Sequence, residues 1–189
     1  MKKITLALGV FLTLFIVSCE GPEGPPGFDG RDGEDGADGI QGQVIEVEGV
    51  GFEYIFDLNS HSAIIAFEDE TTFPVIREDA VLVYRFDGTA EFEDGGVEDL
   101  WSLIPQSFFL PEGTIQYTAT HTSRDVEILI DGNFDLSSLD PGFTQDQIFR
   151  IVILPGEFAA TSKVDKSNIG AVMQSLGVDE TDVRRILLN

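Results

Sequence analysis

Cys19 carries the only thiol of the 189-residue chain. Without a second cysteine, it has no partner for an intramolecular disulfide. The residues before it begin with Lys2 and Lys3 and continue through the apolar run Leu6–Val17, which is the layout of a secretory signal. This run is too short for a stable membrane-spanning helix. We therefore expect residues 1–18 to be a cleaved signal peptide, after which Cys19 needs a role other than disulfide bonding.

The four residues that end at this cysteine, Ile16-Val17-Ser18-Cys19, resemble a bacterial lipobox. The resemblance to lipoprotein precursors implies that the sulfur of Cys19 accepts diacylglycerol and that lipidated Cys19 becomes the new N-terminus. Acyl chains gain about 0.8 kcal/mol per buried methylene, so several chains hold a protein firmly on a membrane. The implied location is the bacterial cell envelope, with the outer membrane as the expected site. Ordinary cleavage near Ser18, which leaves a free thiol, is the alternative.

Glycine occupies every third position after this cysteine. The glycines in register are Gly21, Gly24, Gly27, Gly30, Gly33, Gly36, Gly39 and Gly42. Such a register does not arise by chance at ordinary glycine frequency. Three polyproline-II-like chains wind together only where every third residue lacks a side chain. Residues 19–42 are therefore expected to form a lipidated, collagen-like Gly-X-Y stalk.

The side chains of this segment leave its oligomeric state open. Seven acidic residues accompany the single basic Arg31, which gives the segment a net charge of −6 per chain. Repulsion among three such chains is only partly screened at physiological salt, so a triple helix is marginal. A homotrimer joined through the stalk and an extended single-chain spacer are both compatible with the sequence. Either form would hold the following domain away from the membrane.

The chain as a whole is strongly acidic. Its formal net charge is −23, which becomes −25 once residues 1–18 and their two lysines are removed. Such a surface repels nucleic acid and anionic lipid head groups, so we expect no nucleic-acid partner. Carboxylates also bind hard cations, and calcium is the one cofactor that this composition suggests. No motif specifies a calcium site, and otherwise no cofactor is expected.

Histidines and nucleophiles give no catalytic pattern. His61 and His121 lie far apart in the chain and outside any metal-binding motif, and we expect both at the surface or in loops. The sequence has no Gly-rich phosphate loop with its lysine and no G-x-S-x-G nucleophile motif. We therefore predict no catalytic residues and no enzymatic activity, and the identity of any metal ligands is undetermined.

Carboxylates are numerous, so any one pair carries little information. We expect them mainly in solvated turns, and the clusters are Glu68-Asp69-Glu70, Glu91 with Glu93 and Asp94, and Glu98-Asp99. A glycosidase needs two acids that are close in space and not in sequence. A hydrolase built on such a pair is therefore a lesser alternative.

These side chains must be positioned by a domain that begins near Gln43, where the glycine register stops. Apolar and polar residues alternate in Thr114–Thr120 and again around Val126–Ile130, which predicts an antiparallel hairpin. Further predicted strands are Val44–Val50, Phe52–Leu58, Ala63–Glu68, Ala80–Phe86, Trp101–Pro105 and Ile148–Leu154. Short strands at this density favour an antiparallel β-sandwich or barrel over residues 43–160. Because Ala80–Phe86 and Ile148–Leu154 are apolar on both faces, we expect them in the centre of a sheet.

The last segment, residues 161–189, changes to a helical period. Ile169, Val172, Met173 and Leu176 recur at helical spacing, and Gly177 is well placed as a C-terminal cap. Asp179 could then begin a second short helical turn that ends near Ile186. The sequence predicts a helical hairpin that packs on the sheet or covers one of its edges.

Nearly the whole mature chain resembles a group of uncharacterised lipoproteins from Bacteroidetes-type bacteria. The resemblance rests on the acidic collagen-like leader followed by Ala80-Val81-Leu82-Val83-Tyr84, Trp101-Ser102-Leu103-Ile104-Pro105, Ile115-Gln116-Tyr117, Asp125-Val126-Glu127-Ile128 and Phe149-Arg150-Ile151-Val152-Ile153. These motifs are structural, and the resemblance implies no established activity and no site residues.

Anchor, stalk and the lack of a catalytic pattern together predict an envelope lipoprotein with a structural, adhesive or interaction role. The alternative is a binding module for carbohydrate or another ligand, which would use exposed aromatic rings such as Trp101 or Phe143. Beyond the membrane that holds the lipid, the protein or glycan partner is undetermined.

Overall fold

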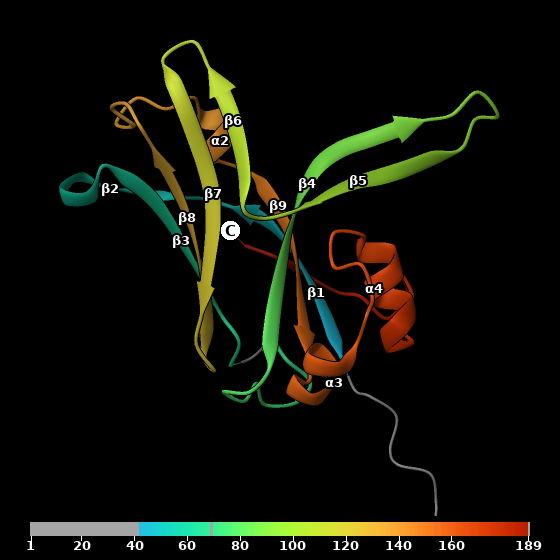
Figure 1. Cartoon of the computed structure of the whole chain (residues 1–189). Coiled ribbons are helices and arrows are strands. Elements are labelled where there is room, and N and C mark those ends of the chain that lie inside the picture. Colours follow the sequence, from blue (N-terminus) through green and yellow to red (C-terminus); the bar gives the residue numbers. More distant parts are fainter. Residues whose placement is uncertain (1–41, 69, 189) are drawn as a thin grey trace, which may run out of the picture. The chain divides into compact units, whose positions relative to one another are not determined.

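The structure is a computed structural model that describes residues 42–68 and 70–188 (Figure 1). The expected signal peptide, Cys19 and the stalk glycines from Gly21 to Gly39 lie outside the described residues. In the part that the structure describes, the fold is mainly β, as predicted, and consists of two five-stranded sheets in a sandwich-like arrangement. None of the helices in that part has both the length and the apolar character needed to cross a membrane.

The two sheets are formed almost entirely by antiparallel neighbours. Sheet A has the order β10-β1-β9-β4-β5, and sheet B has the order β2-β3-β8-β7-β6. Only the pair β1 and β10 is parallel among the described strands. The strands of sheet A are β1 (Gln43–Val50), β4 (Ala80–Glu91), β5 (Val97–Leu103), β9 (Gln147–Leu154) and β10 (Arg184–Leu187). Those of sheet B are β2 (Glu53–Ile55), β3 (Ser60–Ala66), β6 (Gln106–Leu110), β7 (Gly113–His121) and β8 (Asp125–Gly132), and the helices are η1 (Phe56–Leu58), α2 (Pro141–Thr144), α3 (Gly156–Thr161) and α4 (Ile169–Leu176).

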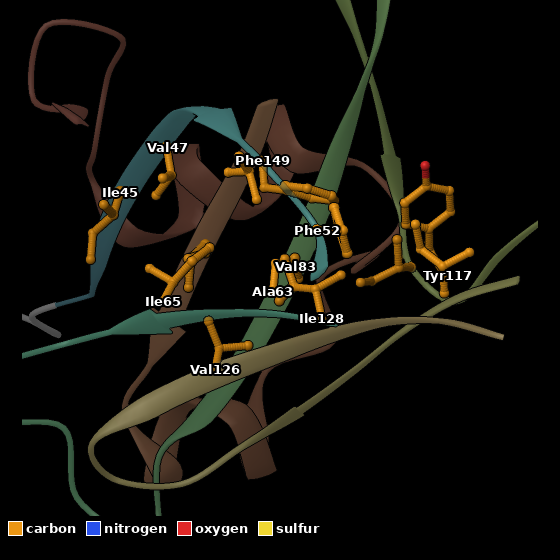
Figure 2. Packing of buried hydrophobic residues seen from close by; sticks show 14 of the residues in the cluster. Ile45, Val47, Phe52, Ala63, Ile65, Val83, Tyr117, Val126, Ile128 and Phe149 are labelled. Carbon is orange, nitrogen blue, oxygen red and sulfur yellow. The ribbon is translucent and has the colours of Figure 1, made fainter. Parts of the chain in front are cut away.

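The main hydrophobic core lies between the sheets. Because successive side chains of a strand point to opposite faces, every second residue of β8 enters this core, and Val126, Ile128 and Ile130 are fully buried. Figure 2 shows Val47 and Phe149 of sheet A on the other side of the same cluster. Full burial of each such side chain contributes about 1.5–3 kcal/mol. The alternation that predicted the β7–β8 hairpin is therefore the pattern that builds the core.

A second core covers the opposite face of sheet A. Val44, Tyr84 and Val152 turn their side chains to this face, where α3 and α4 pack over them. Met173 and Leu176 are among the helix residues that close the cluster. The central strands of sheet A are therefore buried on both faces, which explains why the predicted strand segments Ala80–Phe86 and Ile148–Leu154 of β4 and β9 are almost continuously apolar. Their predicted central position is confirmed, since β9 is the middle strand and β4 lies beside it.

Of the two helical elements predicted in the C-terminal segment, the structure contains the first and not the second. The helix α4 ends at Leu176, and Gly177 caps it with a left-handed φ of 68°. The second helical turn is wrong: Asp179 and Asp182 accept backbone hydrogen bonds within a turn, and the chain continues as β10. A strand forms here because the outer edge of β1 offers unpaired backbone groups, and Arg184–Leu187 pairs with it in parallel. The segment does cover a sheet edge, with a strand and not with a helix.

Beyond this strand pairing, other differences are local. The predicted strand Phe52–Leu58 is a strand only at β2 and then becomes η1, which ends at Asn59 in a left-handed conformation with φ of 49°. The strand β6 and the short helices α2 and α3 were not predicted, and the strand predicted at Trp101–Pro105 is β5, which begins at Val97 and ends at Leu103. Strand β4 also continues to Glu91, beyond the predicted end at Phe86.

This longer β4 creates a projecting ribbon, defined as residues 87–100. Strand β9 pairs with β4 only as far as Arg85, whereas β4 and β5 stay paired up to Glu91 and Val97. A bulge at Asp87, followed by Gly88 with φ of 111°, marks the point where the ribbon leaves the rest of sheet A (Figure 1). Two strands alone are marginal in water, so the ribbon depends on the sheet at its base.

The last glycine of the sequence register lies inside the described part and packs on α4. A β-carbon on Gly42 would come within 2.5 Å of Leu176 Cδ2 and 2.6 Å of its Cδ1. Leu176 belongs to the second core and is almost fully buried. A glycine at position 42 is therefore explained by packing at the start of β1.

Candidate functional site

Arg150 is the most unusual residue in the interior of sheet A. It lies in the middle strand β9, and its side chain is 2% exposed. Its Nε donates to Glu46 Oε2 at 2.6 Å, and its Nη1 and Nη2 donate to the two carboxylate oxygens of Glu180, each at 2.7 Å. The guanidinium also lies 4.3 Å from the centre of the Trp101 ring. A buried charge needs such partners, since an unpaired one is strongly destabilising.

These contacts belong to a closed ring of four ion pairs, here called the Arg150 ring. Its members are Glu46 of β1, Arg150 of β9, Arg185 of β10 and Glu180 in the turn after α4. Arg185 Nε donates to Glu46 Oε1 at 3.0 Å, and its Nη2 lies 3.5 Å from Glu180 Oε2. Two positive and two negative side chains make the ring neutral.

The ring also fixes the protonation state of its central cation. Burial lowers the pKa of Arg150, but hydrogen bonds and charge from Glu180 and Glu46 outweigh burial and hold that pKa above its ordinary value. The guanidinium therefore keeps its charge. Sheet register explains the geometry, because Glu46 and Arg150 are directly opposed in the pairing of β1 with β9.

Beside this ring, an open cleft of about 490 Å³ separates β5 from α4. Trp101 and Arg150 are among its lining residues, and Trp101 is half-buried with its ring 5.3 Å from that of Phe86. Apolar and polar groups line the remainder, namely Val97, Glu98 and Asp99 of β5, Asn168, Ile169, Gly170 and Met173 at α4, and Glu180. The cleft is of the size and mixed character of a ligand pocket.

Two carboxylates of the cleft have no counterion. The side chains of Glu98 and Asp99 make no hydrogen bond or ion pair with any residue that the structure describes. Glu180 lines the same cleft but is held by Arg150 and Arg185. Successive side chains of a strand alternate between its faces, so Asp99 shares the face of Trp101 and Glu98 points to the opposite face. Since the Arg150 ring is neutral, the cleft face carries the uncompensated negative charge of Asp99.

The other predicted aromatic ring, Phe143, lies elsewhere. It packs on the core between the sheets, with its ring 5.4 Å from that of Phe108, and Tyr117 Oη donates to its carbonyl oxygen. Trp101 packs on the opposite face of sheet A. The structure therefore does not bring these two rings together, and both are half-buried where exposed rings were expected.

A second arginine, Arg85, occupies the face of sheet A opposite Arg150. Its guanidinium lies 5.1 Å from the ring centres of both Phe108 and Tyr117, and it bonds Gln147 and Asp87. Burial is the main cause that raises the pKa of Tyr117 to about 12, against an opposing effect of Arg85. This cluster joins the two sheets and is a structural element.

The histidines do not form a site. The prediction for His61 is wrong: it lies in β3, is buried, packs on the Tyr54 ring, and its Nε2 lies 2.9 Å from the carbonyl oxygen of Leu136. It points inward because it shares a strand face with Ala63 and Ile65. His121 is exposed at the end of β7, as expected.

The acidic loops provide no metal centre among the described residues. Within these, no three histidine, cysteine, aspartate or glutamate side chains are grouped closely enough to hold an ion. Asp135, Asp165 and Asp179 instead accept hydrogen bonds from Ser137, Ser167 and Thr181, which lower the pKa of each carboxyl group. Asp69 lies outside the described part, and Glu70 pairs with Arg184 at 3.2 Å. Calcium binding stays a prediction without an assigned site.

Comparison of the chain with family models, curated proteins and solved structures gives no match.

Proposed function

We propose that this chain is an exported lipoprotein of the bacterial cell envelope whose β-sandwich acts by binding and not by catalysis. Cys19 carries the lipid, and the Gly-X-Y segment serves as the spacer between membrane and domain. The observation that carries the proposal is the order of features: a lipobox-like cysteine, a strict glycine register, and a folded domain whose first strand begins at Gln43. A collagen-like lipoprotein of the Bacteroidetes type has this organisation.

The place where the spacer enters the domain supports a tethered role. Strand β1 follows Gly42 directly and lies between β9 and β10, inside sheet A. Glu46 of this strand is held by Arg150 on one side and by Arg185 on the other. A pull on the anchor would therefore load a strand that is paired on both edges and cross-linked by ion pairs.

The cleft beside β5 supports a binding role. It combines the half-buried indole ring of Trp101 with the carboxylate of Asp99, which has no counterion in the described part of the chain, and such groups are available to a ligand. A hydrolase is less well supported, since it needs two convergent carboxylates. Glu98 and Asp99 are consecutive in β5, so their side chains leave opposite faces of the strand, and Glu180 is engaged by Arg150.

Anchoring is tested by comparing the native chain with Cys19→Ala and with the matched control Ser18→Gly, which keeps a small residue before the cysteine. We expect the native chain and the control to incorporate labelled palmitate and to sediment with membranes until detergent is added. Cys19→Ala, exported behind an ordinary signal peptide, should incorporate no palmitate and should appear in the soluble fraction. A Cys19→Ala protein that still sediments with membranes contradicts the proposed anchor.

A further inference from the structure

We propose that the outer edge of β5 binds an extended, basic segment of a partner protein by strand addition, with one basic side chain of that segment in the cleft beside α4. The inference names a partner for the proposed binding role and rests on that role. It follows from the unpaired strand edge, from the charge along it, and from the shape and lining of the cleft.

The edge of β5 is the longest that the described strands leave open. Strand β5 has seven residues, compared with three in β2, four in β10 and five in β6, which are the other strands at the ends of the two sheets. Natural edge strands are commonly protected by shortness, proline, a bulge or charged side chains, and the charges of Glu98 and Asp99 oppose pairing with acidic strands but not with basic ones. Strand β5 has no proline, and the bulge at Asp87 is on β4. Every second residue of β5 therefore presents its N–H and C=O groups outward.

Exposed apolar side chains add contact area at this edge. Val97 and Leu100 are 60% and 46% exposed. They flank the two acidic residues, as Val97-Glu98-Asp99-Leu100, so one apolar and one acidic side chain lie on each face of this part of the strand. An added strand could cover them, because peptides bound at sheet edges gain affinity from main-chain hydrogen bonds and specificity from alternate side chains.

The charge of the ribbon selects a basic occupant. Residues 87–100 contain six acidic residues and no basic residue. Asp87 is neutralised by Arg85, whereas Glu98 and Asp99 have no partner in the described part of the chain. Opposite charges on cross-strand neighbours are favourable. A lysine- or arginine-containing strand would therefore pair its charges with Asp99 on the cleft face or with Glu98 on the opposite face.

The cleft provides a place for one long cationic side chain. It lies between β5 and α4, which are neighbours at the end of sheet A (Figure 1). Trp101, Ile169 and Met173 offer apolar surface to the methylene stem of a lysine or arginine, whose charged end can stay near the carboxylates. The cation of Arg150 does not oppose this, because Glu46 and Glu180 neutralise it within the Arg150 ring.

A second copy of this chain is a poor occupant of the same edge. Antiparallel pairing of two β5 strands would bring the Glu98-Asp99 pairs of both copies together, and like charges across a strand pair are destabilising. The net charge of −25 on each chain without residues 1–18 adds long-range repulsion. A basic partner carries the opposite charge, so it is attracted both by the acidic side chains across the strand pair and by the net charge of the whole chain.

The test measures fluorescence anisotropy of a labelled peptide with alternating lysine and threonine, titrated with the full chain in detergent micelles. A lysine–proline peptide of equal charge is the first control, since it cannot form a strand ladder. A glutamate–threonine peptide is the second. The variant Glu98→Gln with Asp99→Asn removes the two unpaired charges, and the matched variant Glu53→Gln with Asp57→Asn removes two charges at β2 and η1.

We expect the lysine–threonine peptide to bind and both control peptides to fail. Binding should weaken about tenfold in the Glu98→Gln, Asp99→Asn variant and stay within about twofold of the native value in the matched variant. Equal binding of the lysine–proline peptide, or an equal effect of the two variants, would reduce the interaction to unspecific charge attraction and overturn the proposal. Absence of lysine–threonine binding would overturn it as well. This includes the case where sedimentation shows that the chain pairs with a second copy and the peptide does not bind. Because the measurement does not depend on the lipid, its failure leaves the anchoring of Cys19 to be judged by fractionation.

Discussion

Replacement of Arg150 by methionine is the most informative perturbation of the folded domain. Methionine keeps much of the apolar stem beside Trp101 but removes the guanidinium and its three hydrogen bonds to Glu46 and Glu180. Glu180 is 62% exposed and can return to water at little cost, whereas the side chain of Glu46 is only 9% exposed. The buried carboxylate of Glu46 would keep a single partner, Arg185.

The magnitude follows from this difference in burial. Breaking a buried ion pair by removing one partner costs about 3–5 kcal/mol. We expect Arg150→Met at the lower end, at about 3 kcal/mol, because Arg185 remains beside Glu46. The matched variant Arg185→Met removes a cation that is half-exposed, so its cost should stay below about 1 kcal/mol.

The assay is equilibrium unfolding in urea, monitored by fluorescence and by circular dichroism. Trp101 is the only tryptophan of the chain and lies against Arg150, so it reports directly on this region. With an m-value of about 1–3 kcal/mol per molar urea, Arg150→Met should lower the midpoint by about 1–3 M. Glu46→Gln combined with Arg150→Met should cost less than the sum of the two single variants, because both remove the same pair. A loss below about 1 kcal/mol for Arg150→Met, or an equal loss for Arg185→Met, would refute this account of the ring.

Three further outcomes are expected. Burial raises the pKa of Tyr117 from 10.0 to about 12. The neutral phenol therefore stabilises the fold below pH 10, and this contribution is lost as the pH rises to about 12. Tyr117→Phe should reduce the fall of the urea midpoint between these two pH values. Gly42→Ala should destabilise the domain by about 1–3 kcal/mol, because its β-carbon meets Leu176, whereas Gly51→Ala, with 3.4 Å to its nearest neighbour, should have little effect in the same assay. Mass measurement of the chain without residues 1–19 should give three chains if the stalk is a triple helix and one chain after deletion of Gly21–Gly42.

Each of these has a contrary result. An unchanged pH profile in Tyr117→Phe would mean that the buried phenol does not govern alkaline unfolding. Equal midpoints for Gly42→Ala and Gly51→Ala would remove the packing role of Gly42. A mass of one chain with and without the stalk would exclude the trimer and leave the single-chain spacer.

Most of the β-structure could be predicted because it depends on local alternation. Ile115, Tyr117 and Ala119 alternate with polar residues, and the structure turns the first two fully into the core. Strand β10 could not be predicted in this way. The spacing of Asp179, Asp182 and Ile186 also fits a helix, and the choice of a strand depends on the open edge of β1, far away in the sequence. Long-range pairing therefore decided the conformation of this segment.

The candidate site was predictable only in part. Trp101 could be named as a candidate from its residue type, but its partners come from distant segments, and Glu46 and Arg150 are 104 residues apart. One sequence feature did indicate the ion pair of Arg150. A lone arginine in the apolar centre of Ile148–Leu154 needs a buried carboxylate as its partner. The sequence could not show which carboxylate it was. His61 gave no such indication, since its direction depends on the register of β3 within sheet B.

The lipid on Cys19 is the central claim, and mass spectrometry of the N-terminal peptide from the native membrane protein tests it most directly. We predict a peptide that begins at Cys19 and carries the added mass of a diacylglyceryl group on sulfur, without residues 1–18. A peptide with an unmodified thiol at Cys19 would contradict the anchor and, with it, the proposed position of the domain on the cell envelope.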